Sequence, residues 1–310
     1  MHDLTVYSNI GDLSLERTVV AIGSFDGVHC GHQMLLRRVV DLAAQHQLRS
    51  VVLTFWPHPR QVLEQCRDVS SLLSALNEKI SLLKHTGVDG VVVIRFDSAL
   101  SQMTASDFVK EVVVGKLNAQ YLVMGQDHHF GKDRSGNAEY MPDIAAHSGL
   151  QFEVIELKMS GRKISSSDIR EALLSGALLL ANGMLGYEYI ISGKVVSGNS
   201  LGRTIGFPTA NIEIPSHKLL PKNGVYRVKV KIDSGGFDNI GMLYIGKRSV
   251  LKQEDTVDHI EVNIFDFDQQ VYGHEIELAL THRIRDDIKF ENINQLATQL
   301  YKDKQKILNI

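Results

Sequence analysis

The stretch GSFDGVHCGH, residues 23–32, decides the fold of the first half of the chain. It overlaps the end of a short run of apolar, largely β-branched residues, Val19 to Phe25, and it opens a segment with helical spacing of apolar residues, His32 to His46. A glycine-rich turn between a buried strand and a helix gathers free backbone N–H groups at the positive end of the helix dipole. We therefore expect an anion-binding site here, with His29 and His32 placed to face one phosphate group. Taken alone, the stretch also fits a tight turn with two solvent-exposed histidines.

Strand-like and helix-like segments alternate on either side of this turn. Thr104, followed three residues later by Asp107, predicts the start of another helix. Such alternation predicts a parallel sheet covered by helices on both faces, with ligands beyond the carboxyl ends of the strands. The further predicted strands are Ser50 to Phe55, Gly90 to Arg95, Tyr121 to Gly125 and Gln151 to Leu157.

The pattern changes near residue 184, where short alternating segments separated by glycines begin. This pattern predicts a closed antiparallel barrel or a sandwich. Asn292 is the expected N-cap of a final helix that ends at Leu308. We place an α/β domain at residues 1–183 and a β domain at residues 184–310. The predicted strands are Gly224 to Ile232, His259 to Phe267 and Glu275 to Leu280, and the apolar stripe of the helix is Ile293, Leu296, Leu300, Ile307 and Leu308.

Composition narrows the functional classes. The 310 residues suggest two domains, and 33 basic against 36 acidic residues argue against a protein that holds long nucleic acid by its phosphates. The two cysteines, Cys30 and Cys66, exclude a disulfide scaffold and lack the spacing of a zinc site. No apolar run reaches the ~18 residues of a membrane span, and no secretory signal is visible, so we expect a cytoplasmic protein.

Four motifs in the first domain resemble one enzyme family. His29-x-Gly31-His32 resembles the HxGH signature of the nucleotidylyltransferase superfamily, and the longer string around it resembles the FAD-synthetase branch. The resemblance implies a Rossmann-like domain that joins the phosphate of FMN to the α-phosphate of ATP and releases pyrophosphate. The other matching segments are TFWPHP at 54–59, GQDHHFGKDRSG at 125–136 and ISSSDIR at 164–170.

This resemblance assigns roles to residues of the first domain. His29 and His32 would stabilise the reacting phosphate, and hydroxyls at a helix start with Arg170 a turn further on would hold the leaving pyrophosphate. The family usually has phenylalanine where this chain has His128, which we interpret as a loop variant that alters flavin or ATP contact. The implied ATP and pyrophosphate contacts are Gly23, Ser24, Phe25, Gly31, Asp127, Arg134, Ser165, Ser166 and Arg170.

The second domain resembles riboflavin kinases. GRTIGFPTAN at 202–211 resembles their GRxIGFPTAN motif, and HIEVNIFDF at 259–267 resembles a second family segment. The resemblance implies an antiparallel β-barrel with a closing helix, in which Glu261 is the general base on the riboflavin 5′-hydroxyl. It also implies that Thr209 and Asn211 hold Mg²⁺ on ATP, since Mg²⁺ prefers oxygen ligands. The implied nucleotide and flavin contacts are Gly202, Arg203, Gly206, Pro208, Thr209, Asn211 and Arg285.

Together the motifs resemble the bifunctional riboflavin kinase/FAD synthetase family. The expected partners are the small molecules ATP, riboflavin and FMN, with Mg²⁺ as cofactor, no nucleic acid, no membrane, and a monomer or weak homo-oligomer. Tyr187 and Glu188 stand where the family has Arg-Pro in LGRPY, and Ser249 stands where it has proline in NIGxRPT. Two alternatives therefore stay open: an FAD synthetase with a decayed kinase domain, and a non-catalytic flavin-binding or regulatory protein.

Overall fold

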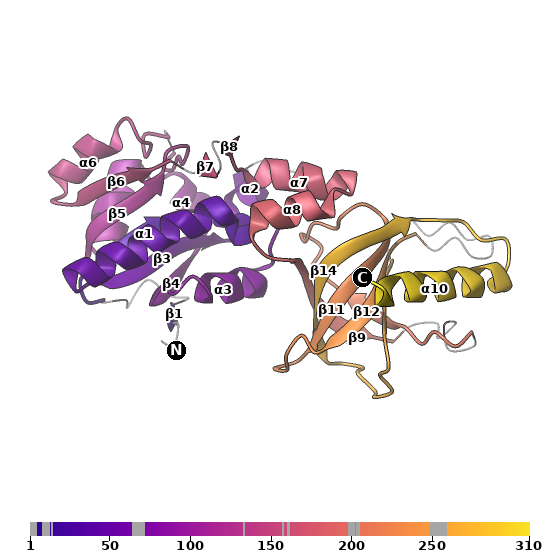
Figure 1. Ribbon diagram of the computed structural model, residues 1–310. Helices are drawn as coiled ribbons and strands as arrows, with labels where there is room; N and C mark the ends of the chain where they lie inside the picture. Colours follow the sequence, from indigo (N-terminus) through magenta and orange to yellow (C-terminus); the bar gives the residue numbers. More distant parts are fainter. Residues whose placement is uncertain are drawn as a thin grey trace. The chain divides into compact units, whose positions relative to one another are not determined.

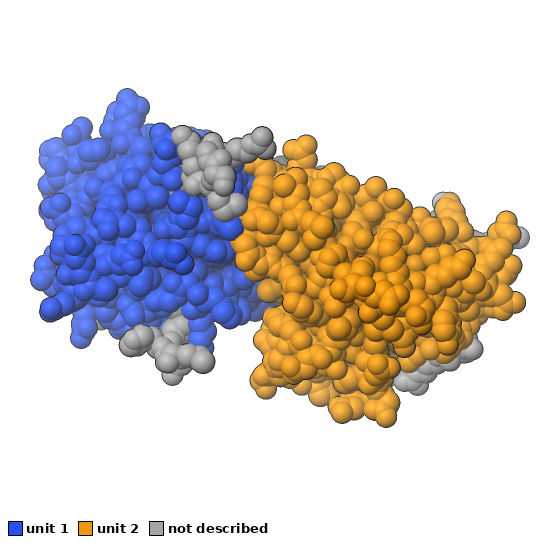
Figure 2. Space-filling model, in the orientation of Figure 1, with its two compact units in different colours: residues 1–69, 76–166 blue, residues 70–75, 167–310 orange. Residues whose placement is uncertain are grey.

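A computed structural model describes residues 5–7, 13, 15–63, 72–132, 134–156, 158–159, 162–197, 202, 205–247 and 259–310. The chain forms two compact units (Figure 2). Unit 1 contains residues 1–69 and 76–166, and unit 2 contains residues 70–75 and 167–310.

A six-stranded sheet forms the centre of unit 1, in the order β1-β4-β3-β2-β5-β6. Every neighbouring pair is parallel, which confirms the predicted parallel sheet. From β2 the chain passes through α1 to β3 on one side, whereas β5 leads to β6 on the other. The carboxyl ends of β2 and β5 therefore form a switch point, where ligands bind in such sheets. The strands are β1 (Thr5–Tyr7), β2 (Thr18–Ile22), β3 (Arg49–Trp56), β4 (Gly90–Arg95), β5 (Ala119–Gly125) and β6 (Gln151–Ile155).

Helices cover both faces of this sheet (Figure 1). Successive residues of a strand point to opposite faces, so Val19 and Ala21 pack with α1 while Val20 and Ile22 pack with η2 and α6. The resulting two-sided core holds the end of β2 in place. The helices of unit 1 are η1 (Asp26–Val28), α1 (Cys30–His46), α2 (Pro59–Leu63), α3 (Leu76–Lys84), α4 (Ser98–Ser101), α5 (Ala105–Phe108), the π-helix η2 (Val109–Val114) and α6 (Met141–His147).

Unit 2 is a closed antiparallel barrel in the order β10-β13-β12-β11-β14-β9, which selects the barrel over the sandwich. Two strands of the barrel start where predicted but end at other residues. The strand that starts at His259 stops at Ile264, and the strand that starts at Glu275 runs on to Asp286. The strands are β9 (Tyr189–Val196), β10 (Ala210–Glu213), β11 (Gly224–Ile232), β12 (Asn239–Gly246), β13 (His259–Ile264) and β14 (Glu275–Asp286).

Two helices precede the barrel, α7 (Ser166–Ser175) and α8 (Leu178–Leu185), and a short hairpin, β7 (Lys158–Met159) with β8 (Arg162–Lys163), precedes them. Asn182 on α8 fixes that helix to the barrel, because its side chain donates to Leu280 O (2.9 Å) and accepts from the Tyr189 N–H (2.9 Å). The boundary between the two compact units lies at the start of α7. The sequence motifs instead place the boundary between the two predicted domains at residues 183/184.

The final helix, α10 (Ile293–Leu308), begins as predicted with Asn292 as N-cap, whose side chain accepts from the Gln295 N–H. It packs Leu300 and Ile307 against Met242 of the barrel. The predicted apolar stripe is only partly buried, since Ile293 is 36% and Leu308 50% exposed. Spacing shows which residues share a face of a helix, but the barrel surface beneath α10 does not extend to both of its ends.

Candidate active sites

The turn after β2 has a strained backbone. Phe25 (φ 47°), Gly27 (φ 75°) and Val28 (φ 35°) all lie in the left-handed region. Glycine adopts this conformation freely, whereas for a β-branched valine it is an outlier. Such strain persists where the surrounding core imposes it, and here Phe25 and Val28 are both 1% exposed. The turn thus directs the chain into α1 with the backbone N–H groups of its first residues at the sheet edge.

The predicted His29 and His32 lie together at the start of α1. Their rings stack with centroids 3.7 Å apart, and the His29 Nδ1 accepts from the His32 backbone N–H at 3.4 Å. Burial, followed by the charges of His29, His128 and Lys79, holds the pKa of His32 well below its ordinary value. Without a bound anion His32 is neutral at pH 7. An anion placed here favours the protonated ring, so the pair is suited to stabilise negative charge.

His128, on the loop after β5, occupies the position where the related family has phenylalanine. Its ring stacks over Phe130 with centroids 6.0 Å apart. Burial, followed by the charge of His129, lowers its pKa to about 4. His128 therefore acts as a neutral aromatic ring at physiological pH, which explains how a histidine can stand at a phenylalanine position.

The remaining predicted residues of this site differ in their contacts and in their exposure to solvent. Ser166 begins α7, and its Oγ donates to the backbone oxygen of Asp26 at 3.2 Å, so the ISSS segment reaches the strained turn. Asp127 forms an exposed ion pair with Lys163 at 2.8 Å, and Arg134 is exposed. Arg170 lies one turn along α7, in the part of the chain that belongs to unit 2. Gly23, Ser24 and Gly31 flank the turn, and Ser165 directly precedes Ser166.

The second site centres on Glu261 in β13. Thr209 Oγ1 donates to Glu261 Oε2 at 3.0 Å. Glu261 pairs with Asn211 of β10 on one side and with Tyr244 of β12 on the other. Directly paired residues of antiparallel strands share a face, so Asn211 lies beside Glu261, and the hydrogen bond adds Thr209 to the group.

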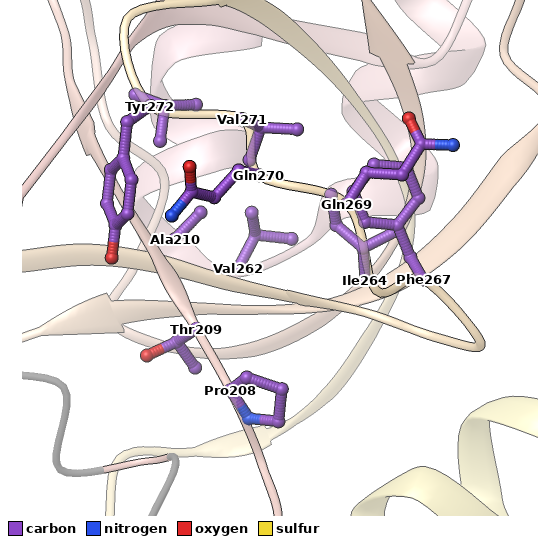
Figure 3. Close-up of a pocket in the computed structure, with 11 residues that line it drawn as sticks. Pro208, Thr209, Ala210, Val262, Ile264, Phe267, Gln269, Gln270, Val271 and Tyr272 are labelled. Atoms are coloured by element: carbon purple, nitrogen blue, oxygen red, sulfur yellow. The ribbon is translucent and has the colours of Figure 1, made fainter.

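A pocket lies beside this group (Figure 3). Its empty volume is about 490 Å³, including open solvent. Pro208 and Thr209 lie on one side, and the loop of Phe267, Gln270 and Tyr272 lies on the other. Thr209 belongs both to this lining and to the contact with Glu261. The pocket was not predicted, because its loop residues come from far along the chain from Thr209.

The turn from Gly202 to Pro208 brings the motif to β10. The Phe207 N–H donates to Gly202 O at 2.8 Å, and a Cβ at Gly202 would collide with the Phe207 carbonyl oxygen. Only glycine fits so close an approach. Asn263 then holds the turn from β13, since its Nδ2 donates to Pro208 O at 2.6 Å. Gly206 has φ 78°, and Arg203 lies outside the described residues.

Arg285 has its guanidinium occupied by protein groups. Its Nε donates to Asp303 Oδ2 of α10 at 2.8 Å, with the Asp303 side chain only 3% exposed, and its Nη1 donates to Asp286 O at 2.9 Å. The pair attaches the closing helix to β14. The structure thus gives Arg285 a clear role in positioning α10, and its predicted contact with nucleotide or flavin stays a prediction.

Comparison with known proteins finds a match for each half of the chain. A family model for FAD synthetase matches residues 12–168, and one for riboflavin kinase matches residues 185–310. The bifunctional riboflavin kinase/FMN adenylyltransferase of Bacillus subtilis is 37% identical over 94% of this chain and 92% of its own length. The Listeria monocytogenes protein of the same name is 39% identical over 93% and 90%. The chain belongs to the bifunctional riboflavin kinase/FMN adenylyltransferase family.

A crystal structure also resembles this family member over its whole length. It is described as a macrolide-efflux protein from Streptococcus pneumoniae, is 32% identical, covers 99% of both chains and has a TM-score of 0.85. In the part of the present chain that the structure describes, no helix is long and apolar enough to cross a membrane.

This member of the bifunctional riboflavin kinase/FMN adenylyltransferase family departs from the motif pattern near the second site. Tyr244 stands where the NIGxRPT motif begins, and its hydroxyl donates to Asp287 Oδ1 at 3.2 Å. Glu188, in place of the proline of LGRPY, pairs with Lys229 at 2.8 Å. Tyr187 is half-buried, whereas Ser249 lies outside the described residues. Tyr244 and Glu188 thus each contact a side chain of unit 2, and the hydrogen bond between Thr209 and Glu261 is present beside these replacements.

Proposed function

We propose that this chain phosphorylates riboflavin to FMN in its C-terminal domain, residues 184–310, and adenylylates FMN to FAD in its N-terminal domain, residues 1–183. The observation that supports the proposal is that each unit brings together residues to which the resemblance assigns phosphate chemistry. Unit 1 has the stacked His29–His32 pair at a helix N-terminus, and unit 2 has Glu261 held by Thr209.

In the kinase reaction the Glu261 carboxylate accepts the proton of the riboflavin 5′-hydroxyl as that oxygen attacks the γ-phosphate of ATP. The bond from the γ-phosphorus to the bridging oxygen breaks, and ADP leaves. The hydrogen bond from Thr209 fixes the carboxylate in one orientation. Phosphoryl transfer depends mainly on such positioning and on electrostatic stabilisation. The pocket shares Thr209 with the Glu261 contact, which supports it as the site that receives ATP.

The residues at this site fit a magnesium ion. Thr209 offers a hydroxyl oxygen and Asn211 an amide oxygen, and among the described residues no cluster of three His, Cys, Asp or Glu side chains competes for a metal. Mg²⁺ commonly takes few protein ligands and fills its shell with phosphate oxygens and water. Bound here, Mg²⁺ would neutralise charge on the triphosphate.

In the adenylyl transfer a phosphate oxygen of FMN attacks the α-phosphorus of ATP, and pyrophosphate leaves with the electron pair of the broken bond. His29 and His32 stabilise the charge at that phosphorus, assisted by the backbone N–H groups of Gly31 and its neighbours. Gly23, Ser24 and Phe25 form the turn beside the α-phosphate, Asp127 and Arg134 flank ATP, and Ser165, Ser166 and Arg170 hold the pyrophosphate. No covalent enzyme intermediate is required, because FMN is the nucleophile.

The test is to supply riboflavin, ATP and Mg²⁺ and to separate the products by chromatography over time. FMN should appear first, followed by FAD with an equal amount of pyrophosphate. FAD formed from added FMN, without FMN formed from riboflavin, would instead support a decayed kinase domain. Tight FMN binding without ATP turnover would support a regulatory protein. A cytoplasmic location, a monomeric or weakly oligomeric state and the absence of nucleic-acid partners stay predictions.

A further inference from the structure

Lys79 is a buried lysine that the sequence motifs do not explain. It lies on α3, is 1% exposed, and its Nζ has no hydrogen-bond partner among the described residues. The ring centroid of Trp56 lies 5.6 Å from this Nζ. Burial lowers the pKa of Lys79 to about 8 although the charge of Asp26 acts in the opposite direction. The side chain therefore remains largely protonated at neutral pH, and a buried ammonium that makes no hydrogen bond within the described part of the chain calls for an explanation.

The position of α3 connects Lys79 to the adenylyl-transfer site. α3 packs against η1, the strained turn that leads into His29. The charge of Lys79 acts on His32, and the charge of Asp26 acts on Lys79. The ammonium of Lys79 and the imidazoles of His29, His32 and His128 thus lie near the end of β2. The negative charge that acts on Lys79 comes from Asp26. This arrangement of basic groups favours a bound anion, because a phosphate would accept a hydrogen bond from the Lys79 ammonium.

We propose that Lys79 is a binding residue for the phosphate group of the flavin mononucleotide that accepts the adenylyl group. The order of the strands in the sheet indicates which of the two anionic substrates, ATP or FMN, lies next to Lys79. The residues predicted to hold ATP and pyrophosphate come from the turn after β2 itself, from the β5 side of β2, through Asp127, or from the segment after β6, through Ser166. Lys79 and Trp56 come from the opposite side, from α3 and the end of β3 (Figure 1). Two substrates that meet at one phosphorus atom approach it from opposite sides, which leaves Lys79 to the acceptor.

The chemistry gives this ammonium a defined use. The FMN phosphate is a monoester with up to two negative charges, and it must approach the triphosphate of ATP, which is also negative. A cation that pairs with the monoester reduces this repulsion and holds the attacking oxygen in place. In FAD the same phosphorus is joined to the AMP phosphorus through an anhydride oxygen and carries a single negative charge, so the interaction with Lys79 weakens when the product forms.

The experiment compares Lys79→Met with Lys84→Met, an exposed lysine on the same helix. The inference rests on the proposed function, so FAD formation by the wild-type enzyme is measured first, and its absence would refute that function rather than the role of Lys79. In Lys79→Met the KM for FMN should rise roughly ten- to a hundredfold, the effect of losing a hydrogen bond to a charged group. The KM for ATP and the rate of FMN formation in unit 2 should stay within about twofold, as should all values of Lys84→Met.

Folding is checked separately through Trp56, the single tryptophan of the chain, whose fluorescence reports on unit 1. Because the substitution removes a buried charge that has no hydrogen-bond partner in the described ranges, the thermal midpoint of Lys79→Met should be equal to or above that of the wild type. An unfolded Lys79→Met, an unchanged KM for FMN, or a rise in the KM for ATP alone would each overturn the proposal. Lys79→Gln, which keeps a polar side chain without the charge, should show the same selective rise in the KM for FMN.

Discussion

Replacing Glu261 with glutamine gives a quantitative test of the kinase site. The amide oxygen of the introduced glutamine can still accept the hydrogen bond that Thr209 donates at 3.0 Å, so the geometry is retained while the proton acceptor is lost. A positioned general base contributes roughly 10²–10⁴-fold to a rate. The rate of FMN formation should therefore fall by that factor, which corresponds to an increase of about 3–5 kcal/mol in the activation free energy.

The Thr209 hydrogen bond can be tested in the same assay. Thr209→Val keeps the shape of the side chain and removes the donor, and a hydrogen bond to a charged group is worth about 1.5–3 kcal/mol. FMN formation should fall roughly ten- to a hundredfold, and the double variant should lose less than the sum of both free energies, because the residues are in contact. FMN and FAD are measured by chromatography with riboflavin or FMN as the starting flavin.

Two controls accompany these variants. Glu277→Gln changes a carboxylate that pairs with Lys231 elsewhere on the barrel, and it should leave FMN formation within about twofold of wild type. FAD formation from added FMN should be unchanged in every variant, because none of these substitutions touches a residue proposed to act in that reaction. If Glu261→Gln forms FMN at the wild-type rate, Glu261 is not the base and the proposed kinase chemistry is wrong.

Three further predictions concern the histidines and the closing helix. Combining His29→Ala with His32→Ala should abolish FAD formation and leave FMN formation intact; equal loss of both in a folded protein would refute the assignment. The pKa of His128 is about 4 in the folded chain and its unfolded value is higher, so the unfolded chain binds more protons between these values and stability should fall as pH drops from 7 to 5. Replacing His128 with phenylalanine should reduce this loss by roughly 1–2 kcal/mol in denaturant titrations, and an unchanged pH dependence would show that the ring is not buried neutral. Asp303→Ala should destabilise the barrel by about 3–5 kcal/mol, because it leaves Arg285 without its buried partner; a midpoint equal to wild type would remove Arg285 as the anchor of α10.

Much of the fold was predictable from local patterns. The strands Gly90–Arg95 and Gly224–Ile232 have their predicted bounds, because apolar residues and turn residues delimit them. The N-caps Thr104 and Asn292 were also predictable, since a short polar side chain there accepts from the third residue beyond it. By contrast, strand β1 (Thr5–Tyr7) was missed, because it is short and its pairing with β4 is not visible locally.

The site was predictable where one motif contains the interacting residues. His29 and His32 are three residues apart on one helix start, and their stacking follows from that spacing. Long-range relations could not be predicted. The burial of Lys79 beside Trp56 and the ion pair between Arg285 and Asp303 depend on how separate elements pack. From a helix or strand pattern alone, a lysine or an arginine is expected to be exposed.

The central claim is that the chain carries two separate ATP sites, one in each unit. The most direct measurement is the binding stoichiometry of a non-hydrolysable ATP analogue with Mg²⁺, by equilibrium dialysis of the full chain. We predict two molecules bound per chain at saturation, and a reduced number when the unit 2 site is altered by Thr209→Val together with Glu261→Gln. A single molecule bound per wild-type chain at saturation would contradict the account.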